Sequence, residues 1–184
     1  MLRIVSILLL AAAVCICGCM GASESGTGEQ IAWNLTVAGD TEEVLTLAEL
    51  RALPAEEGYG YAVSTVGITF GPNRYRGVLV ADLALMAGGV DENDLVYVSA
   101  EDGYLWVFDT DQVRGKGFFT FDENLREIPA PPLRVILAYE QDGRPLTYEE
   151  GGPLRIVIIT ESPDVITEGS SWVKWVDRVE VHRR

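Results

Sequence analysis

The sequence predicts one α+β domain that is rich in β-strand. Residues 31–184 mix apolar and polar positions throughout, and they contain no internal repeat and no second linker. Runs of β-branched and aromatic residues recur, and Asp-Gly turns interrupt two of them, at residues 102–103 and 142–143. Helical signals are confined to two short stretches. A domain of this size buries about 70% of the surface that its unfolded chain exposes, which is enough for one hydrophobic core.

Two short helices are expected in the first half of this domain. Thr46 and Glu49 have the spacing of a capping box, so a helix is predicted to begin there and to end at Pro54. Residues 80–89 (VADLALMAGG) form an apolar run that ends in glycine, which is typical of a helix with a glycine C-cap. We expect this second helix to bury Leu83, Leu85 or Met86.

Strands are expected wherever β-branched and aromatic residues are concentrated. The segments concerned are AWNLTVAG (32–39), YAVSTVGI (61–68), DLVYVSAEDGYLWVFD (94–109), RVILAYEQDGRPL (134–146), LRIVIIT (154–160) and WVKWVDRVEVH (172–182). Residues 69–77 are expected to form a loop. Residues 114–132 have no clear period and contain prolines, which predicts a long surface insertion or lid.

All three cysteines of the chain lie in its apolar N-terminal stretch, at residues 15, 17 and 19. Arg3 precedes an apolar run and small residues follow it, which is the layout of an export signal. The run is shorter than the roughly 20 apolar residues that a membrane-spanning helix needs. Residues 16–19 (ICGC) resemble the lipobox of prokaryotic lipoproteins, in which the final cysteine receives lipid. We therefore expect a signal peptide with a lipobox over residues 1–18 and lipidation of Cys19; an ordinary signal peptide cut nearby is the alternative.

Export on either interpretation removes Cys15 and Cys17. The folded domain then has neither a disulfide framework nor a cysteine metal site. Residues 19–30 are polar and rich in glycine, which predicts a flexible tether between the lipid and the domain at residues 31–184. We expect the protein at the outer face of the cell membrane or in the periplasm, bound to the membrane through its N-terminal lipid.

Charge and histidine content exclude several functions. The chain carries 28 acidic and 14 basic residues, a net charge of −14, so its surface repels nucleic-acid phosphates and anionic lipids. The single histidine, His182, lies near the C-terminus, which excludes a Ser-His-Asp relay and a multi-histidine metal site. The acidic run at residues 91–94 lacks the ligand spacing of a calcium loop and is interpreted as a solvated turn.

Five segments occur in an order that matches a known family. They are YRGVLVADLALMAGGV, DLVYVSAEDGY, VILAYEQDGRPL, GGPLRIVI and SSWVKWVDRVEV, between Tyr75 and Val181. This succession resembles the molybdopterin-binding domain of the sulfite-oxidase-type oxidoreductases. The resemblance implies a compact α+β fold, mostly β, with the pterin held in a cleft between these segments. A small anionic ligand and an envelope redox protein are the candidate partners.

This chain departs from the family's pattern at the position expected for the metal ligand. The resemblance implies a cysteine thiolate on the strand before the tyrosine-x-glycine-valine segment at residues 75–78, because soft sulfur suits molybdenum. The loop length places Ser64 or Thr65 at that position, and neither is a thiol. No metal ligand and no catalytic residue is therefore expected, although a hydroxyl at either position remains a candidate for ligand binding.

Five further residues are candidates for ligand binding. Family members hold the pterin phosphate with a glycine and two spaced lysines, whereas here Gly169 is followed by serines, including Ser171, and then by Lys174 alone. A hydroxyl supplies no countercharge to a phosphate. Lys174 either contacts a ligand or faces solvent on the last strand. The remaining candidates are Asp102 and Tyr104, which alternatively form a plain turn, and Arg155, which alternatively pairs with a carboxylate such as Glu150.

Three functions follow from these observations. The first is a non-catalytic binding or accessory module that retains the fold and needs no cofactor. The second is a molybdopterin-dependent oxidoreductase with a metal environment that lacks cysteine. The third is a structural interaction domain of the cell envelope. A pocket lined by Tyr104 and Arg155 would favour the first over the third, and a filled cleft with an exposed apolar patch would favour the third.

Overall fold

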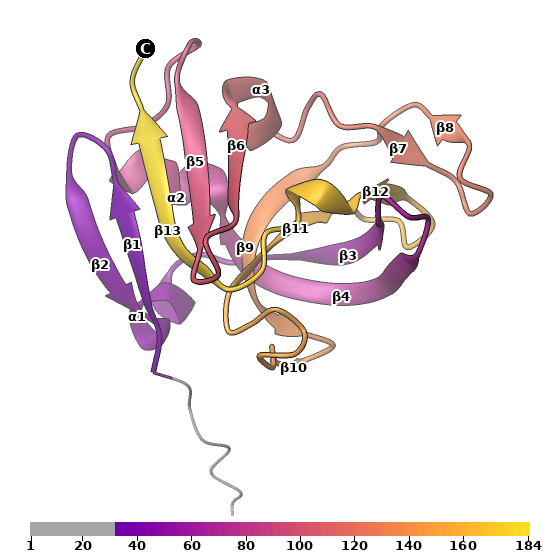
Figure 1. Cartoon of the computed structure of the whole chain (residues 1–184), viewed down its shortest axis with the longest axis horizontal. Coiled ribbons are helices and arrows are strands. Elements are labelled where there is room, and N and C mark those ends of the chain that lie inside the picture. Colours follow the sequence, from indigo (N-terminus) through magenta and orange to yellow (C-terminus); the bar gives the residue numbers. More distant parts are fainter. Residues whose placement is uncertain (1–31) are drawn as a thin grey trace, which may run out of the picture. The chain divides into compact units, whose positions relative to one another are not determined.

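The computed structural model describes residues 32–184. The predictions for the signal peptide, for lipidation of Cys19 and for the tether lie outside these residues. Two β-sheets and a few short helices build the described part of the chain (Figure 1). None of the helices between residues 32 and 184 is long and apolar enough to cross a membrane.

The first sheet has five strands in the order β2-β1-β13-β5-β6. Its strands are β1 (Asn34–Ala38), β2 (Glu42–Thr46), β5 (Leu95–Ala100), β6 (Leu105–Asp109) and β13 (Val176–His182). Neighbours are antiparallel except β1 and β13, which run parallel with Thr36 opposite Arg178. Alternate residues of these strands are buried, for example Val96 and Val98 of β5, so one face of the sheet packs on the core.

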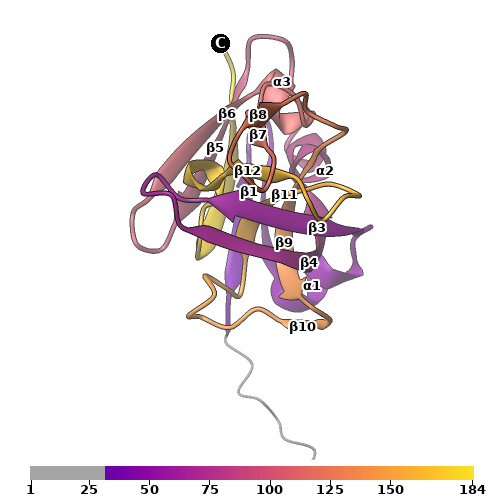
Figure 2. The same cartoon turned by 90° about the vertical axis from the view of Figure 1, so that its right-hand side faces the viewer.

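The second sheet has the order β10-β9-β4-β3-β12-β7-β8, and β11 also pairs with β9. Its strands are β3 (Glu56–Val63), β4 (Thr69–Leu79), β7 (Thr120–Phe121), β8 (Glu127–Ile128), β9 (Arg134–Gln141), β10 (Arg144–Pro145), β11 (Arg155–Ile159) and β12 (Ile166–Glu168). β3 and β4 form a long antiparallel hairpin that crosses Figure 2. β9 and β11 supply much of the apolar core.

Helices complete the core. They are α1 (Leu47–Ala52), α2 (Val80–Met86), α3 (Thr110–Val113) and the 3-10 helix η1 (Gly169–Ser171). The capping box of α1 is present, because Thr46 Oγ1 accepts the Glu49 N–H and the Glu49 carboxylate accepts the Thr46 N–H. In α2, Leu83 is fully buried and Met86 packs at the edge of the core. Leu85 is 68% exposed, so the expectation that it could be a core residue is wrong.

The structure corrects the predicted strand and loop over residues 61–77. β3 begins at Glu56 and ends at Val63, and a turn follows in which the Gly67 N–H donates to the Ser64 carbonyl at 2.9 Å. Residues 69–77 belong to β4 and pair with both β3 and β9. Gly71 and Pro72 gave this strand the composition of a loop, although tertiary pairing decides its conformation.

Two other boundaries differ from the sequence predictions. The last strand begins at Val176 rather than at residue 172, because Trp175 has a positive φ of 50° that breaks the extended backbone. The segment 114–132 is not wholly irregular: β7 and β8 lie within it, and β7 pairs with β12 at the edge of the second sheet. The predicted single β-rich domain with few helices is otherwise confirmed.

Candidate functional site

A hollow of about 370 Å³ opens beside the second sheet. The β3–β4 hairpin, β9, β11, η1 and the chain just before β13 contribute to its lining. The side chains that give it chemical character are Ser64, Tyr75, Glu150, Arg155, Trp172 and Lys174. The hollow thus brings together three of the sequence candidates, which are far apart in the chain.

Arg155, the first residue of β11, is the cation at the centre of this site. Its Nη1 donates to the backbone carbonyl of Glu150 at 2.6 Å, and its guanidinium lies over the Trp172 ring at 5.5 Å from the centroid. Its Nε is buried and has no hydrogen-bond partner among the described residues. Burial lowers the pKa of Arg155, yet a guanidinium stays charged in proteins. The site therefore holds a buried positive charge with an unused donor.

Glu150 does not neutralise Arg155 through its carboxylate. The Glu150 carboxylate accepts hydrogen bonds from Arg144, with Nη1 at 2.8 Å, and from the Thr147 N–H at 2.9 Å. These bonds, first the one from Arg144, lower the pKa of Glu150 to about 2. The expected pairing of Arg155 with this carboxylate is wrong, because only the backbone carbonyl of Glu150 meets Arg155.

Two buried aromatic rings form one wall of the hollow. Tyr75 of β4 and Trp172 meet edge to face, with ring centroids 5.8 Å apart. The indole Nε1 of Trp172 donates to Thr167 Oγ1 at 3.2 Å, and burial raises the pKa of Tyr75. Gly60 of β3 passes so close that a Cβ there would lie 2.8 Å from Tyr75 and 2.9 Å from Trp172. The rings are therefore held in place by the sheet itself.

Lys174 lies at the exposed rim of the same hollow. It precedes β13, so its expected position on the last strand is wrong. Its side chain crosses Gly151, where an added Cβ would lie 2.4 Å from Lys174 Cγ, and its Nζ is 5.7 Å from the centroid of the Trp175 ring. Desolvation, and then the charge of Arg155, lowers the pKa of Lys174. Lys174 thus supplies a second, weaker cation.

Ser64 and Thr65 occupy the turn between β3 and β4. Ser64 lines the hollow, and its Oγ accepts the Ile68 N–H at 3.0 Å. Thr65 is exposed and does not line the hollow. The expectation of a rigid strand at this position is wrong, because β3 ends at Val63 and the turn follows.

The other three candidates lie outside the hollow. Ser171 is buried, and its hydroxyl donates to the Glu168 carbonyl at 3.2 Å. Asp102 and Tyr104 belong to the β5–β6 turn, where the Asp102 carboxylate accepts the Tyr104 N–H and Gly103 has a φ of +84°. The Tyr104 hydroxyl donates to the Ser170 carbonyl at 2.9 Å, so the turn contacts η1 instead of a ligand pocket.

Sequence reasoning missed the aromatic wall. In the sequence, Tyr75 stands out only as part of the family segment, and the pattern at Trp172 predicts a strand. A tyrosine placed between polar residues of β4 and a tryptophan two residues before an exposed lysine are the available signals. Neither signal shows that the two rings meet, because they are distant in sequence and come together only through the pairing of β3 with β4 and β12.

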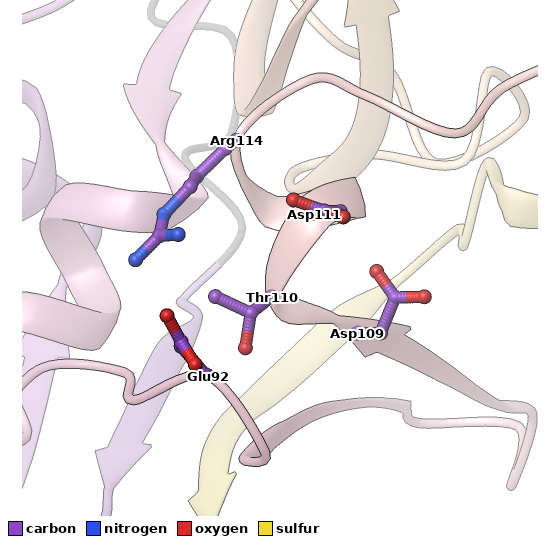
Figure 3. Close-up of a pocket in the computed structure, with 5 residues that line it drawn as sticks. All are labelled: Glu92, Asp109, Thr110, Asp111 and Arg114. Atoms are coloured by element: carbon purple, nitrogen blue, oxygen red, sulfur yellow. The ribbon is translucent and has the colours of Figure 1, made fainter.

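A second hollow, of about 390 Å³, lies where the first sheet meets α3 (Figure 3). Its lining residues are Glu92, Asp109, Thr110, Asp111 and Arg114. Thr110 Oγ1 donates to the Asp91 carbonyl at 2.7 Å, which ties α3 to the loop before β5. Three carboxylates and one guanidinium leave this hollow acidic, and none of the sequence candidates lies in it.

The donor chemistry of the described residues does not provide a metal site. Residues 32–184 contain no cysteine, and no group of three or more histidine, cysteine, aspartate or glutamate side chains there could hold a metal ion. Arg155 and Lys174 offer charge to an anion, and the two aromatic rings offer a flat apolar surface.

The family model for the oxidoreductase molybdopterin-binding domain matches residues 24–184. The chain belongs to this family. The uncharacterised oxidoreductase YuiH of Bacillus subtilis is 31% identical over 125 residues, which cover 67% of this chain and 54% of YuiH. Human and rat mitochondrial sulfite oxidases are 43% identical over 51 residues, which cover 28% of this chain and 8% of each oxidase. The chain thus spans about half of YuiH and a small part of the sulfite oxidases.

A solved structure supports the fold. The sulfane dehydrogenase SoxCD from Paracoccus pantotrophus superposes with a TM-score of 0.62 at 20% identity, covering 83% of this chain and 38% of that one. The sulfite-oxidase-type fold predicted from the sequence is confirmed.

Molybdopterin fits the hollow only in part. The organic anion has suitable partners in Arg155, Lys174 and the rings of Tyr75 and Trp172. The metal does not, because the lining of the hollow contains no thiol and no imidazole, and Ser64 offers it a hydroxyl instead. A neutral hydroxyl is a poor ligand until it is deprotonated, and the acidic chain supplies little positive potential for that step.

Proposed function

We propose that this domain is a non-catalytic binding or accessory module that holds a small anionic ligand at Arg155. The observation that carries the proposal is that the Arg155 guanidinium lines an open hollow together with Lys174, while the Glu150 carbonyl is its one hydrogen-bond partner among the described residues. An anionic ligand in the hollow would accept hydrogen bonds from the guanidinium donors that the Glu150 carbonyl does not use, and hydrogen bonds to a charged group contribute about 1.5–3 kcal/mol each. An open hollow also disfavours a purely structural interaction domain, for which a filled cleft is expected.

The lining residues support binding better than catalysis. The Glu150 carboxylate is held in its ionised form by Arg144, and its pKa of about 2 makes it a poor proton donor near neutral pH. Burial raises the pKa of Tyr75, which opposes its use as a base. The lining contains no histidine and no thiol. A ligand would therefore meet charge, aromatic surface and hydrogen-bond donors.

Location is the second part of this proposal. The apolar stretch and the ICGC sequence support export with lipid attached at Cys19, on the outer face of the cell membrane or in the periplasm. One acyl chain gives marginal membrane attachment, so stable attachment needs two chains. Mass spectrometry of the mature N-terminus tests this, and a mature chain that begins at any other residue contradicts it.

A calorimetric titration with inorganic phosphate tests the site. Replacing Arg155 by methionine keeps an unbranched side chain but removes the charge, and we expect phosphate to bind about tenfold or more weakly. Arg178→Met is the matched control, because Arg178 pairs with Glu42 and Glu180 on the first sheet. That control is expected to leave the affinity within about twofold. Equal phosphate affinity of the wild type and Arg155→Met would contradict the proposal.

A molybdopterin-dependent oxidoreductase with a non-cysteine metal environment is the second candidate function. The observation in its favour is that Ser64 lines the hollow, since Ser64 is one of the two residues that the loop length predicts at the family's thiolate position. Elemental analysis for molybdenum and tungsten, on protein purified from its native host, separates the two functions. We expect no stoichiometric metal, and about one metal per chain that is lost in Ser64→Ala would establish the oxidoreductase instead.

A further inference from the structure

The two edges of the first sheet differ in how they are protected. β2 forms one edge and carries Glu42 and Glu43, charges that discourage the addition of another strand. β6 forms the other edge with the sequence LWVFD, and it has no lysine, proline or bulge before its final aspartate. Unprotected edges of this kind are templates for strand addition.

The backbone of β6 has free groups on its outer side. The Ala100 N–H donates to the Tyr104 carbonyl at 3.0 Å, which begins the β5–β6 ladder. Hydrogen-bonded and non-hydrogen-bonded pairs alternate in an antiparallel ladder. The backbone N–H and carbonyl groups of Leu105 and Val107 therefore point away from β5. The sheet ends at β6, so no further strand pairs with these groups among residues 32–184.

Apolar side chains and carboxylates are arranged along the same edge. Leu105 is 47% exposed and Val107 is 36% exposed, and the two side chains share one face of the strand. Asp102 lies just before β6 and Asp109 ends it, and both are exposed. Asp111, which follows in α3, lines the acidic hollow of Figure 3 together with Asp109. The edge therefore offers an apolar centre between two acidic ends.

The negative charge along this edge disfavours a second copy of the chain as the occupant. An antiparallel β6–β6 pair that places Leu105 opposite Val107 brings Asp102 of each copy beside Asp109 of the other. These carboxylates are close together although not directly opposite, and each copy carries a net charge of −14, so two copies repel each other. A segment with cations at both ends has the complementary charge.

We propose that the β6 edge binds an extended segment of another protein as an added strand, with alternating apolar side chains flanked by lysine or arginine. Main-chain bonds to Leu105 and Val107 supply affinity, and contacts with their side chains and with the acidic ends supply specificity. This surface is independent of the hollow at Arg155, so it goes beyond the proposed binding of a small anion.

Nuclear magnetic resonance with a defined peptide tests the proposal. The probe is the blocked peptide Lys-Thr-Val-Thr-Val-Thr-Lys, titrated into the isotope-labelled domain. We expect the amide signals of residues 105–109 to shift, and we expect a peptide with glutamate at both ends to bind about tenfold more weakly. Shifts spread over the whole surface, or equal affinity of the two peptides, would overturn the proposal.

Variants of β6 locate the interaction. Val107→Pro removes one outward N–H and is tolerated on an edge strand, so peptide affinity should fall about threefold to tenfold. Val107→Thr keeps that N–H and should stay within about twofold of the wild type. Leu105→Lys serves if the proline variant does not fold, because it repels a cationic segment and should weaken binding. Unchanged affinity in folded Val107→Pro and in Leu105→Lys, or a concentration-dependent dimer in sedimentation, would show that a cationic strand is not the occupant.

Discussion

Two arginines, one from each sheet, are held in different ways. In the first sheet, Arg178 forms ion pairs with Glu42 at 3.2 Å and with Glu180 at 2.5 Å, both near the surface. In the second sheet, Arg155 lies beside a hollow and over the Trp172 ring, and a backbone carbonyl is its one hydrogen-bond partner among the described residues, which leaves its buried Nε unpartnered. A charge whose partners are all present stabilises or orients the fold, whereas a buried charge with an unused donor is a better indication of a ligand.

The largest expected effect tests whether the two sheets form one cooperative unit. α2 packs against β1 and β13 of the first sheet and against β4 and β9 of the second. Because Leu83 is fully buried in this position, Leu83→Ala should lower the free energy of unfolding by about 2–5 kcal/mol. Denaturant unfolding followed by fluorescence and by circular dichroism should show one coincident transition in both proteins.

Leu85 provides the control on the same helix. Leu85 is 68% exposed, so Leu85→Ala should change stability by no more than about 0.5 kcal/mol. Two separate transitions in Leu83→Ala would show that the sheets unfold independently. Equal stability losses in the two variants would contradict the assignment of the buried face of α2.

The first sheet could be predicted from sequence more completely than the second. The β5–β6 hairpin follows from alternation and from an Asp-Gly turn, since one face of this sheet packs on the core and the other meets solvent. β4 was predicted as a loop, because Gly71 and Pro72 give it the composition of a turn. Its conformation is decided by pairing with β3 and with β9, and local sequence does not encode either partner.

The site was predictable only where single residues carry unusual chemistry. Arg155 and Lys174 stand out because each interrupts an apolar or aromatic stretch. The partners of Arg155 could not be predicted, since the loop before β11 sets which atom of Glu150 faces it and Arg144 holds the carboxylate elsewhere. Tyr75 and Trp172 meet through long-range pairing, which no local pattern reports.

An intermediate effect is expected for the carboxylate of Glu150, which lies in the loop just before β11. Its pKa is about 2 in the folded protein and 4.5 ordinarily, so folding favours the ionised form. This contribution to stability is present above pH 4.5 and is lost as the pH falls through about 2. Because Arg144 is half exposed, solvent screening reduces it, and Glu150→Gln should cost about 1–2 kcal/mol at neutral pH.

The pH dependence of that difference is the measurement. Unfolding curves of the wild type and of Glu150→Gln should converge as the pH falls from 4.5 towards 2. Glu161→Gln is the control, because Glu161 forms an ion pair with Arg134 but is 82% exposed, and it should cost less than about 0.5 kcal/mol. A stability difference that does not change with pH would show that the ionised carboxylate is not what stabilises the loop.

The smallest expected effect concerns Lys174. Lys174 is a cation at the rim of the hollow that loses its charge at alkaline pH, whereas Arg155 keeps its charge. Desolvation and the charge of Arg155 lower the pKa of Lys174, so its positive charge is lost at lower pH than that of an ordinary lysine. Binding of an anion should therefore be strongest below this pKa and should weaken as the pH rises through it. Sulfate is a suitable probe because its charge does not change over this range.

Sulfate affinity, measured by calorimetry at increasing alkaline pH, should fall by about twofold to threefold, since Lys174 is exposed and its charge is screened. Lys174→Arg keeps a positive charge throughout, so its affinity should be nearly constant over the same pH range. Lys174→Met should bind sulfate, at every pH, with the weaker affinity that the wild type reaches at alkaline pH. Because Arg155 remains charged in all three proteins, a residual affinity that persists in Lys174→Met would come from the interior cation. If Lys174→Arg showed the same decline as the wild type, the titrating group would lie elsewhere and Lys174 would have no part in binding.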